Sequence, residues 1–281
     1  ALAPGPAAGL GVTLAQRRVG GAEVARSRGL DGLASDLTDV GRMAGGLDAS
    51  VRRTITDAVR AVSIRLGALG LIATPERCPT IKDMVSLGAG PGGGTEPDGV
   101  RVLLSEGTWH FTSGETVGWN RVQLTALMPG RTVFERNVVD SRPLIALTGT
   151  ECQLRGIRFN DTLGAQPAVK VTGARGEVHD CVFDQCDRAV LVDGASFVRV
   201  DGNRVRASRN ASYVINAEGT CSGLRIVTNA IESDSNFEID LETGVTASVV
   251  VGNAIGATGI VRYFGANNHA IAGNTGTTTV R

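Results

Sequence analysis

The most regular pattern of apolar and polar positions lies between residues 144 and 274, where a strand-like segment recurs. Each copy alternates apolar and polar residues and then reaches a glycine, and the copies cover residues 145–149, 169–173, 190–194, 214–219, 239–244 and 261–265. A second series lies between them, at residues 154–159, 178–183, 200–205, 226–231, 250–255 and 271–274. Both series return every 21 to 26 residues, so one structural unit repeats once per period.

Each unit contains short β-branched segments separated by Gly and Asn, and it leaves no room for a helix of ordinary length. Strands that return to the same lateral position pair in parallel with the next turn, about 4.8 Å away. The pattern therefore predicts an all-β fold, a right-handed parallel β-helix over residues 99–281.

Alternation of side chains along a strand predicts which residues point inward. One inward column consists of Leu154, Val178, Val200, Ile226, Val250 and Ile271, and a second consists of Phe159, Val182 or Phe183, Val205, Ile231 and Ile255. The recurrent Asn203, Asn229, Asn253 and Asn274 predict a turn ladder. Asn tolerates the left-handed conformation, and its amide can bond the same amide one coil along.

Before the repeats, apolar residues follow heptad spacing with one break, which predicts an amphipathic helix over residues 28–72. Its apolar seam consists of Leu30, Leu33, Leu37, Val40, Leu47, Val51, Ile55, Val59, Val62 and Leu66. We interpret it as a trimerisation coiled coil, the alternative being an ordinary surface helix. Residues 1–27 predict an extended attachment arm, and the Gly- and Pro-rich residues 73–98 predict a flexible linker.

Composition narrows the classes of function. The 28 basic and 28 acidic residues balance, so no net field favours nucleic acid. The five cysteines form no CxxC pair, and the three histidines are not at metal-ligand spacing with them, so we expect no metal and no cofactor. The apolar stretch 58–72 contains Arg60 and Arg65 and is too short to span a bilayer, so no membrane insertion is expected.

The start of the predicted β-helix carries a resemblance to a known family. Glu106-Gly-Thr-Trp109 follows a strand, and Val122-Gln-Leu124 and Pro129-Gly-Arg-Thr-Val-Phe134 come next. This series resembles the first coils of pectate-lyase-like β-helices in phage tailspikes, with Glu-Gly-Thr-Trp in place of the usual Pro-Gly-Thr-Tyr. The order of arm, heptad helix and short β-helix is similar to that of trimeric virion spikes, including head spikes of gene transfer agents.

The resemblance implies a homotrimeric spike or fibre protein of a phage-like particle, assembled in the bacterial cytoplasm. Its expected partners are particle proteins, contacted through the arm and through the C-terminal end near residues 277–281, and host surface polysaccharide. Two alternatives stay open: a tailspike depolymerase, either a glycoside hydrolase or a lyase, and a purely structural connector that carries a further fibre. The polygalacturonase-type motifs Asn-Thr-Asp, Asp-Asp, His-Gly and Arg-Ile-Lys are absent, which argues against hydrolysis.

The candidate catalytic residues are Glu238, Asp240 and Glu242, which alternation places outward on one strand. Residues two apart on a strand lie about 7 Å apart, within the range for an inverting glycosidase. The competing interpretation is a surface ion pair between Asp240 and Arg262 of the next coil, worth at most about 1 kcal/mol. The alignment also places Asp240 beside Ile215, in an outward column of Lys170, Leu191, Ile215, Asp240 and Arg262 that another protomer would cover.

The candidate carbohydrate-binding residues are Tyr213, Glu238, Asp240 and Arg262, with Tyr213 outward beside Glu238. A second outward set consists of Arg155, His179, Arg199 and Arg225, which could hold an acidic saccharide or simply be solvated. Trp109 and Trp119 are predicted to cap the beginning of the β-helix, and Tyr263 is predicted to point inward.

Overall fold

The computed structural model describes residues 72–89, 98–137, 139–161, 166–206, 213–232, 237–256, 259–264 and 268–280, together with residues 57, 58 and 61. The chain divides into two compact units, Ala1–Val59 and Arg60–Arg281, and the architecture below is that of the second. The predicted attachment arm and the seam of the predicted trimerisation helix lie outside the described residues, so both stay predictions.

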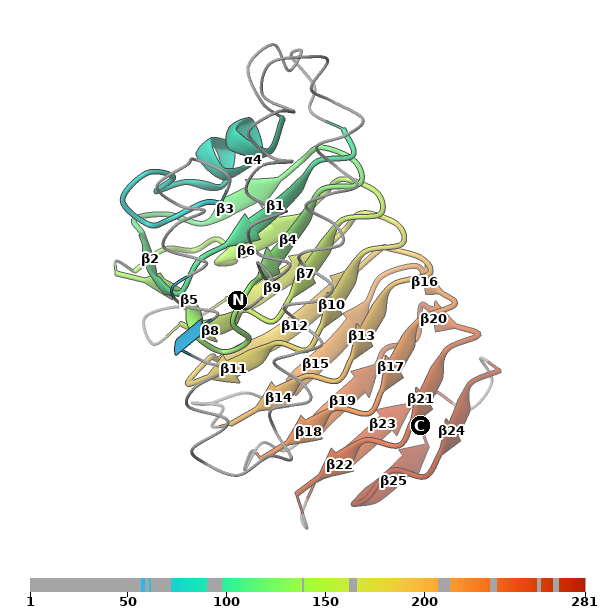
Figure 1. Ribbon diagram of the computed structural model, residues 1–281. Coiled ribbons are helices and arrows are strands. Elements are labelled where there is room, and N and C mark those ends of the chain that lie inside the picture. Colours follow the sequence, from blue (N-terminus) through green and yellow to red (C-terminus); the bar gives the residue numbers. More distant parts are fainter. Residues whose placement is uncertain are drawn as a thin grey trace, which may run out of the picture. The chain divides into compact units, whose positions relative to one another are not determined.

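Three parallel sheets form the body of the second unit (Figure 1). The first sheet contains β1 (Arg101–Leu104), β4 (Gln123–Ala126), β7 (Gln153–Arg155), β10 (Glu177–His179), β13 (Arg199–Asp201), β17 (Arg225–Val227), β21 (Val249–Val251) and β24 (Ala270–Ala272). The second contains β2 (Gly107–Phe111), β5 (Thr132–Arg136), β8 (Arg158–Asn160), β11 (Val182–Asp184), β14 (Arg204–Val205), β18 (Ala230–Ile231) and β22 (Ala254–Ile255).

The third sheet contains β3 (Glu115–Val117), β6 (Ile145–Leu147), β9 (Pro167–Val171), β12 (Arg188–Asp193), β15 (Tyr213–Glu218), β19 (Phe237–Leu241), β23 (Ile260–Tyr263) and β25 (Thr277–Val280). A two-stranded pair joins β16 (Cys221–Ser222) to β20 (Val245–Thr246). The chain visits the three sheets in turn, so each strand pairs in parallel with its equivalent one coil away. This topology confirms the predicted parallel β-helix.

The register confirms both inward columns. Leu154, Val178, Val200, Ile226, Val250 and Ile271 are successive partners in the first sheet. Phe159, Phe183, Val205, Ile231 and Ile255 are successive partners in the second, so Phe183 rather than Val182 points inward. Aromatic rings extend this column toward the first coils, with centroids 5.8 Å apart for Phe134 and Phe159 and 4.9 Å for Phe159 and Phe183.

The asparagine ladder is also confirmed. The Nδ2 of Asn203 donates to Oδ1 of Asn229 at 3.0 Å, that of Asn229 to Asn253 at 2.9 Å, and that of Asn253 to Asn274 at 2.8 Å. The left-handed conformation, however, belongs to the residue before each Asn: Gly202, Thr228, Gly252 and Gly273. The preceding residue turns the chain, and the buried amide then satisfies the turn's polar groups.

A second corner of each coil also contains a residue with positive φ. These residues are Arg121, Glu151, Arg175, Phe197, Gly223, Ala247 and Asn268. Their backbone N–H groups donate to the next coil in a regular series, for example Arg175 to Ser196 and Phe197 to Ser222. This corner joins the third sheet to the first, and it requires a left-handed residue whatever the side chain.

Helix α4 (Ile81–Ala89) packs beside β1 and β3, at the first coil (Figure 1). Thr80 and Asp83 form a capping box, in which Oγ1 of Thr80 accepts the Asp83 N–H at 3.2 Å and Oδ2 of Asp83 accepts the Thr80 N–H at 3.2 Å. Ile81, Met84 and Val85 are buried in the core. Residues 73–89 of the predicted linker are therefore part of the folded body, which corrects the prediction of a flexible segment there.

Two tryptophans lie near this end of the β-helix. Trp109 is buried, and its Nε1 donates to the carbonyl of Cys78 at 2.8 Å, directly beside the segment that leads into α4. Trp119 is partly buried against the core. Over the described residues, the chain contains no helix that is long and apolar enough to cross a membrane.

Candidate functional site

The acidic strand β19 differs in exposure from the prediction. Glu238 and Asp240 both have 0% exposed surface, whereas alternation alone predicted that they would face solvent. Asp240 lies opposite Arg262 of β23, as predicted, and its carboxylate receives two hydrogen bonds from that guanidinium. Arg262 is only 3% exposed, so this is a buried ion pair and not the predicted surface pair. The limit of about 1 kcal/mol for surface pairs does not apply to it.

The neighbour of Asp240 on the previous coil is Asn216, not Ile215. Ile215 instead pairs with Ile239 in the inward column, so the outward column reads Lys170, Leu191, Asn216, Asp240, Arg262. The alignment failed by one residue because Val214 and Ile215 are both apolar, and either could start the inward series. Both are buried, so hydrophobicity does not distinguish the two phases.

Glu238 binds the backbone of the following coil. Its Oε2 accepts the N–H of Ile260 at 2.6 Å. A Cβ at the neighbouring Gly259 would lie 2.9 Å from this oxygen, so glycine leaves the space that the carboxylate occupies. The contact gives Glu238 a structural role at the turn into β23.

Tyr213 lies opposite Phe237 and not opposite Glu238. The guanidinium carbon of Arg262 lies 5.1 Å from the centre of the Tyr213 ring, a cation–π distance. The hydrogen bonds that its guanidinium donates to Asp240 raise the pKa of Arg262 further above its usual range, so it remains charged. The structure thus brings together Tyr213, Asp240 and Arg262 of the predicted carbohydrate-binding set, through contacts within the chain. Tyr263 is half-buried against the core and lies edge-on to His269.

Sequence reasoning missed a row of three carboxylates at the ends of the strands of the third sheet. Asp193 pairs with Glu218, and Glu242 is the next in line, since Ala217 pairs with Leu241. Lys170 contacts Asp193 at 2.8 Å. In the described part of the chain neither Glu218 nor Glu242 forms an ion pair within 4 Å, although the charges of Arg188 and Lys170 partly counteract the rise in the pKa of Glu218. Burial and then the charges of Glu242 and Asp193 raise the pKa of Glu218. The signal available in the sequence was an acidic residue one or two positions before the glycine of a copy, as at Asp193, Glu218 and Glu242.

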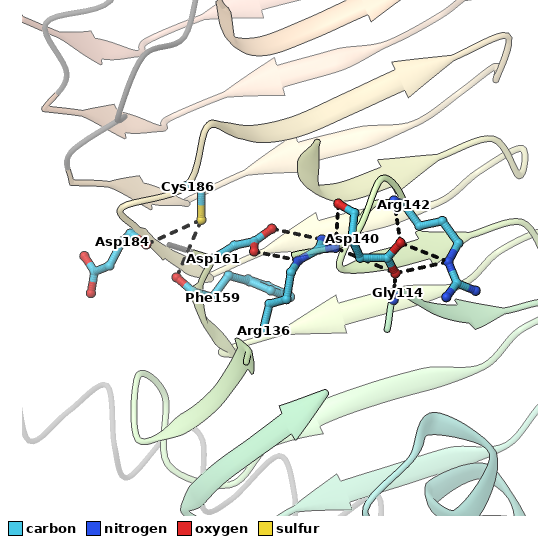
Figure 2. A network of polar contacts seen from close by, with 8 residues as sticks. All are labelled: Gly114, Arg136, Asp140, Arg142, Phe159, Asp161, Asp184 and Cys186. Atoms are coloured by element: carbon cyan, nitrogen blue, oxygen red, sulfur yellow. Dashed lines mark hydrogen bonds and ion pairs between the residues drawn. The ribbon is translucent and has the colours of Figure 1, made fainter. Parts of the chain in front are cut away.

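A separate buried network joins the turns that follow β5 and β8 (Figure 2). Nε and Nη2 of Arg136 donate to the two carboxylate oxygens of Asp161 at 2.8 and 3.1 Å, and both side chains are fully buried. Nη1 of Arg136 also donates to the carbonyl of Asp140 at 3.4 Å, and the Asp140 carboxylate accepts the N–H of Gly114 at 2.7 Å. The Arg136–Asp161 pair is bidentate, so the network stabilises the turns and offers little to a ligand.

Other chemistry is limited. The five cysteines are all unpaired and buried. Burial raises the pKa of the Cys181 thiol to about 12, which suppresses the reactive thiolate. Among the residues that the structure describes, no group of three His, Cys, Asp or Glu side chains could hold a metal ion.

Sequence reasoning also missed an exposed aromatic side chain. Phe197 is 61% exposed and occupies the left-handed corner between β12 and β13, with φ of 60°. Its position in the same column as Arg175 and Gly223 could have been read from the repeat, but its exposure could not.

The fold defines the class of protein: a parallel β-helix, consistent with the pectate-lyase-like type. A scan of the chain against protein-family models finds no match, and a search of curated protein sequences finds none either.

Proposed function

We propose that the protein is a structural spike or fibre component of a phage-like particle and that its β-helix binds host cell-surface polysaccharide. The observation that carries the binding proposal is the in-register outer face of the first sheet. Here Gln153, Glu177, Arg199 and Arg225 follow one another on successive coils. A repeating ladder of hydrogen-bonding groups that are spaced about 4.8 Å apart suits an extended polymer.

The spike assignment has separate support, from the heptad seam of residues 28–72 and from the resemblance of the first coils to tailspike β-helices. In this proposal the heptad helix forms a homotrimer and the N-terminal arm attaches to other particle proteins. The C-terminal end of the β-helix is a second proposed attachment point. The particle is assembled in the bacterial cytoplasm.

The test combines assembly with glycan binding. Light scattering on the full chain and on residues 74–281 should give a trimer only for the full chain. The purified full chain is then passed over a panel of bacterial capsular polysaccharides and lipopolysaccharides, and both retention and polymer length are measured. Retention without shortening supports the adhesive role. If the protein neither retains nor shortens any polymer, the binding proposal is refuted and a structural connector is left.

A depolymerase is the second candidate, and the pair Glu218 and Glu242 favours it. These residues lie on adjacent coils with backbones about 5 Å apart, so their carboxyl groups are able to reach the roughly 5 Å separation of retaining glycosidases. The raised pKa of Glu218 suits a general acid, and Glu242 is the second carboxylate of the pair. Asp240 and Glu238 of the originally predicted trio are engaged by Arg262 and Ile260. Polymer shortening that Glu218→Gln abolishes would establish this activity, and shortening that survives this substitution would exclude the pair.

A further inference from the structure

Phe197 occupies a position that the fold does not explain. The corner requires a left-handed backbone, which a bulky side chain adopts only with strain, whereas the equivalent residue of the next coil is Gly223. Because the side chain remains 61% exposed, burial does not offset that cost. Neither backbone preference nor core packing therefore accounts for an aromatic residue here.

The Phe197 ring packs at a defined position on the surface. A Cβ at Gly223 would lie 2.7 Å from Cδ1 of Phe197 and 2.9 Å from Cε1, so the ring lies against the glycine of the next coil. A larger residue at 223 would displace it. Gly223 therefore covers part of the Phe197 ring, and most of the side chain stays exposed to solvent.

Hydrogen-bonding groups surround this single apolar surface. The hydroxyls of Ser196 and Ser222 lie 3.0 Å apart, each on the residue before a corner position. Arg175, the equivalent of Phe197 on the preceding coil, is exposed and pairs with Glu151 at 3.0 Å. One aromatic ring bordered by polar side chains is too small for the apolar core of a protein interface.

Arg225 supplies an available charge. It lies two residues beyond Gly223, in register with Arg199 of the preceding coil. Arg199 is paired with Asp201, at 2.7 Å from Nε to Oδ2. The side chain of Arg225 is exposed and, within the described ranges, makes neither an ion pair nor a hydrogen bond. A guanidinium with free donors is suited to bidentate binding of a carboxylate.

We infer that Phe197 and Arg225 form a binding platform for an acidic saccharide. The C–H face of one sugar ring packs on Phe197, a carboxylate of the same or the next sugar binds Arg225, and the serine hydroxyls bind sugar hydroxyls. This inference rests on the proposed polysaccharide-binding function and assigns it to a specific corner of coils that contain β13 and β17.

The experiment uses the full chain and the uronic-acid-containing members of the polysaccharide panel, each paired with its carboxyl-reduced, neutral form. Phe197→Ala should weaken binding about ten-fold or more, as expected for an aromatic anchor. Phe197→Trp should retain binding. Arg225→Gln should weaken binding to the acidic polymer and leave binding to its reduced form unchanged. The matched controls are Val139→Ala, at another exposed apolar residue, and Arg204→Gln, at an exposed arginine of the second sheet; both should bind as the wild type does.

Folding is checked with Phe197→Gly, since glycine adopts the left-handed corner without strain. Its urea midpoint should equal or exceed that of the wild type while binding falls as in Phe197→Ala. If the wild type binds acidic polymers and the Phe197 variants bind equally well, the platform is refuted while the proposed function stands. If the wild type binds no polysaccharide, the proposed function fails as well. Loss of self-association in Phe197→Ala without any change in glycan retention would assign the ring to contact with a second copy and would also refute the platform.

Discussion

The asparagine ladder allows the contribution of one buried side chain to be calculated. Asn229 makes four side-chain hydrogen bonds: its Oδ1 accepts the N–H and the Nδ2 of Asn203, and its Nδ2 donates to Oδ1 of Asn253 and to the carbonyl of Val200. Each is 2.9 to 3.0 Å long. Asn229→Ala removes all four and leaves the buried N–H of Asn203 without its acceptor. At about 1 kcal/mol for each bond, the free energy of unfolding should fall by about 4 kcal/mol.

Asn274 provides the matched control, because it occupies the last position of the ladder and is half-exposed. Its side chain accepts two hydrogen bonds from Asn253 and donates one to Val250, and water can replace these when it is removed. Asn274→Ala should therefore cost only about 1 kcal/mol. Urea unfolding followed by circular dichroism measures both variants. Equal losses, or a loss below about 1 kcal/mol for Asn229→Ala, would refute the view that buried ladder bonds stabilise the coils.

Three further predictions concern charge and thiols. Asp240→Ala should lower the free energy of unfolding by about 3 kcal/mol, because it leaves the buried guanidinium of Arg262 without a counterion, and a thermal or urea melt checks it. A loss below about 1 kcal/mol, the value for an exposed pair, would show that Arg262 is solvated. Native protein should react with a thiol reagent at pH 8 far more slowly than unfolded protein, since burial raises the pKa of all five cysteines, that of Cys181 to about 12. Fast labelling of native protein would contradict the described core. The raised pKa of Glu218 means that its contribution to stability is full below the unfolded value near 4.5 and is lost as the pH rises through the folded pKa. Glu218→Gln should remove that part of the pH dependence, and an unchanged stability profile would contradict the assignment.

The sequence by itself determined the repeat, the pairing of equivalent strands and the inward columns. Parallel stacking makes each coil the template for the next, so Val178, Val200 and Ile226 must occupy one column if the period is read correctly. Asn203 and its equivalents follow for the same reason. Even the partner of Asp240 could be predicted, since Ile239 and Val261 define the phase of their strands.

Only the tertiary structure decided which of these groups are accessible. Strand alternation predicts which face of a sheet a side chain occupies, but it does not predict what packs against that side chain. Glu238 and Asp240 are therefore buried and engaged although the pattern predicted exposure. The phase of β15 was ambiguous because Val214 and Ile215 are both apolar. The exposure of Phe197 depends on the glycine of another coil, a contact between residues 26 positions apart that no local pattern contains.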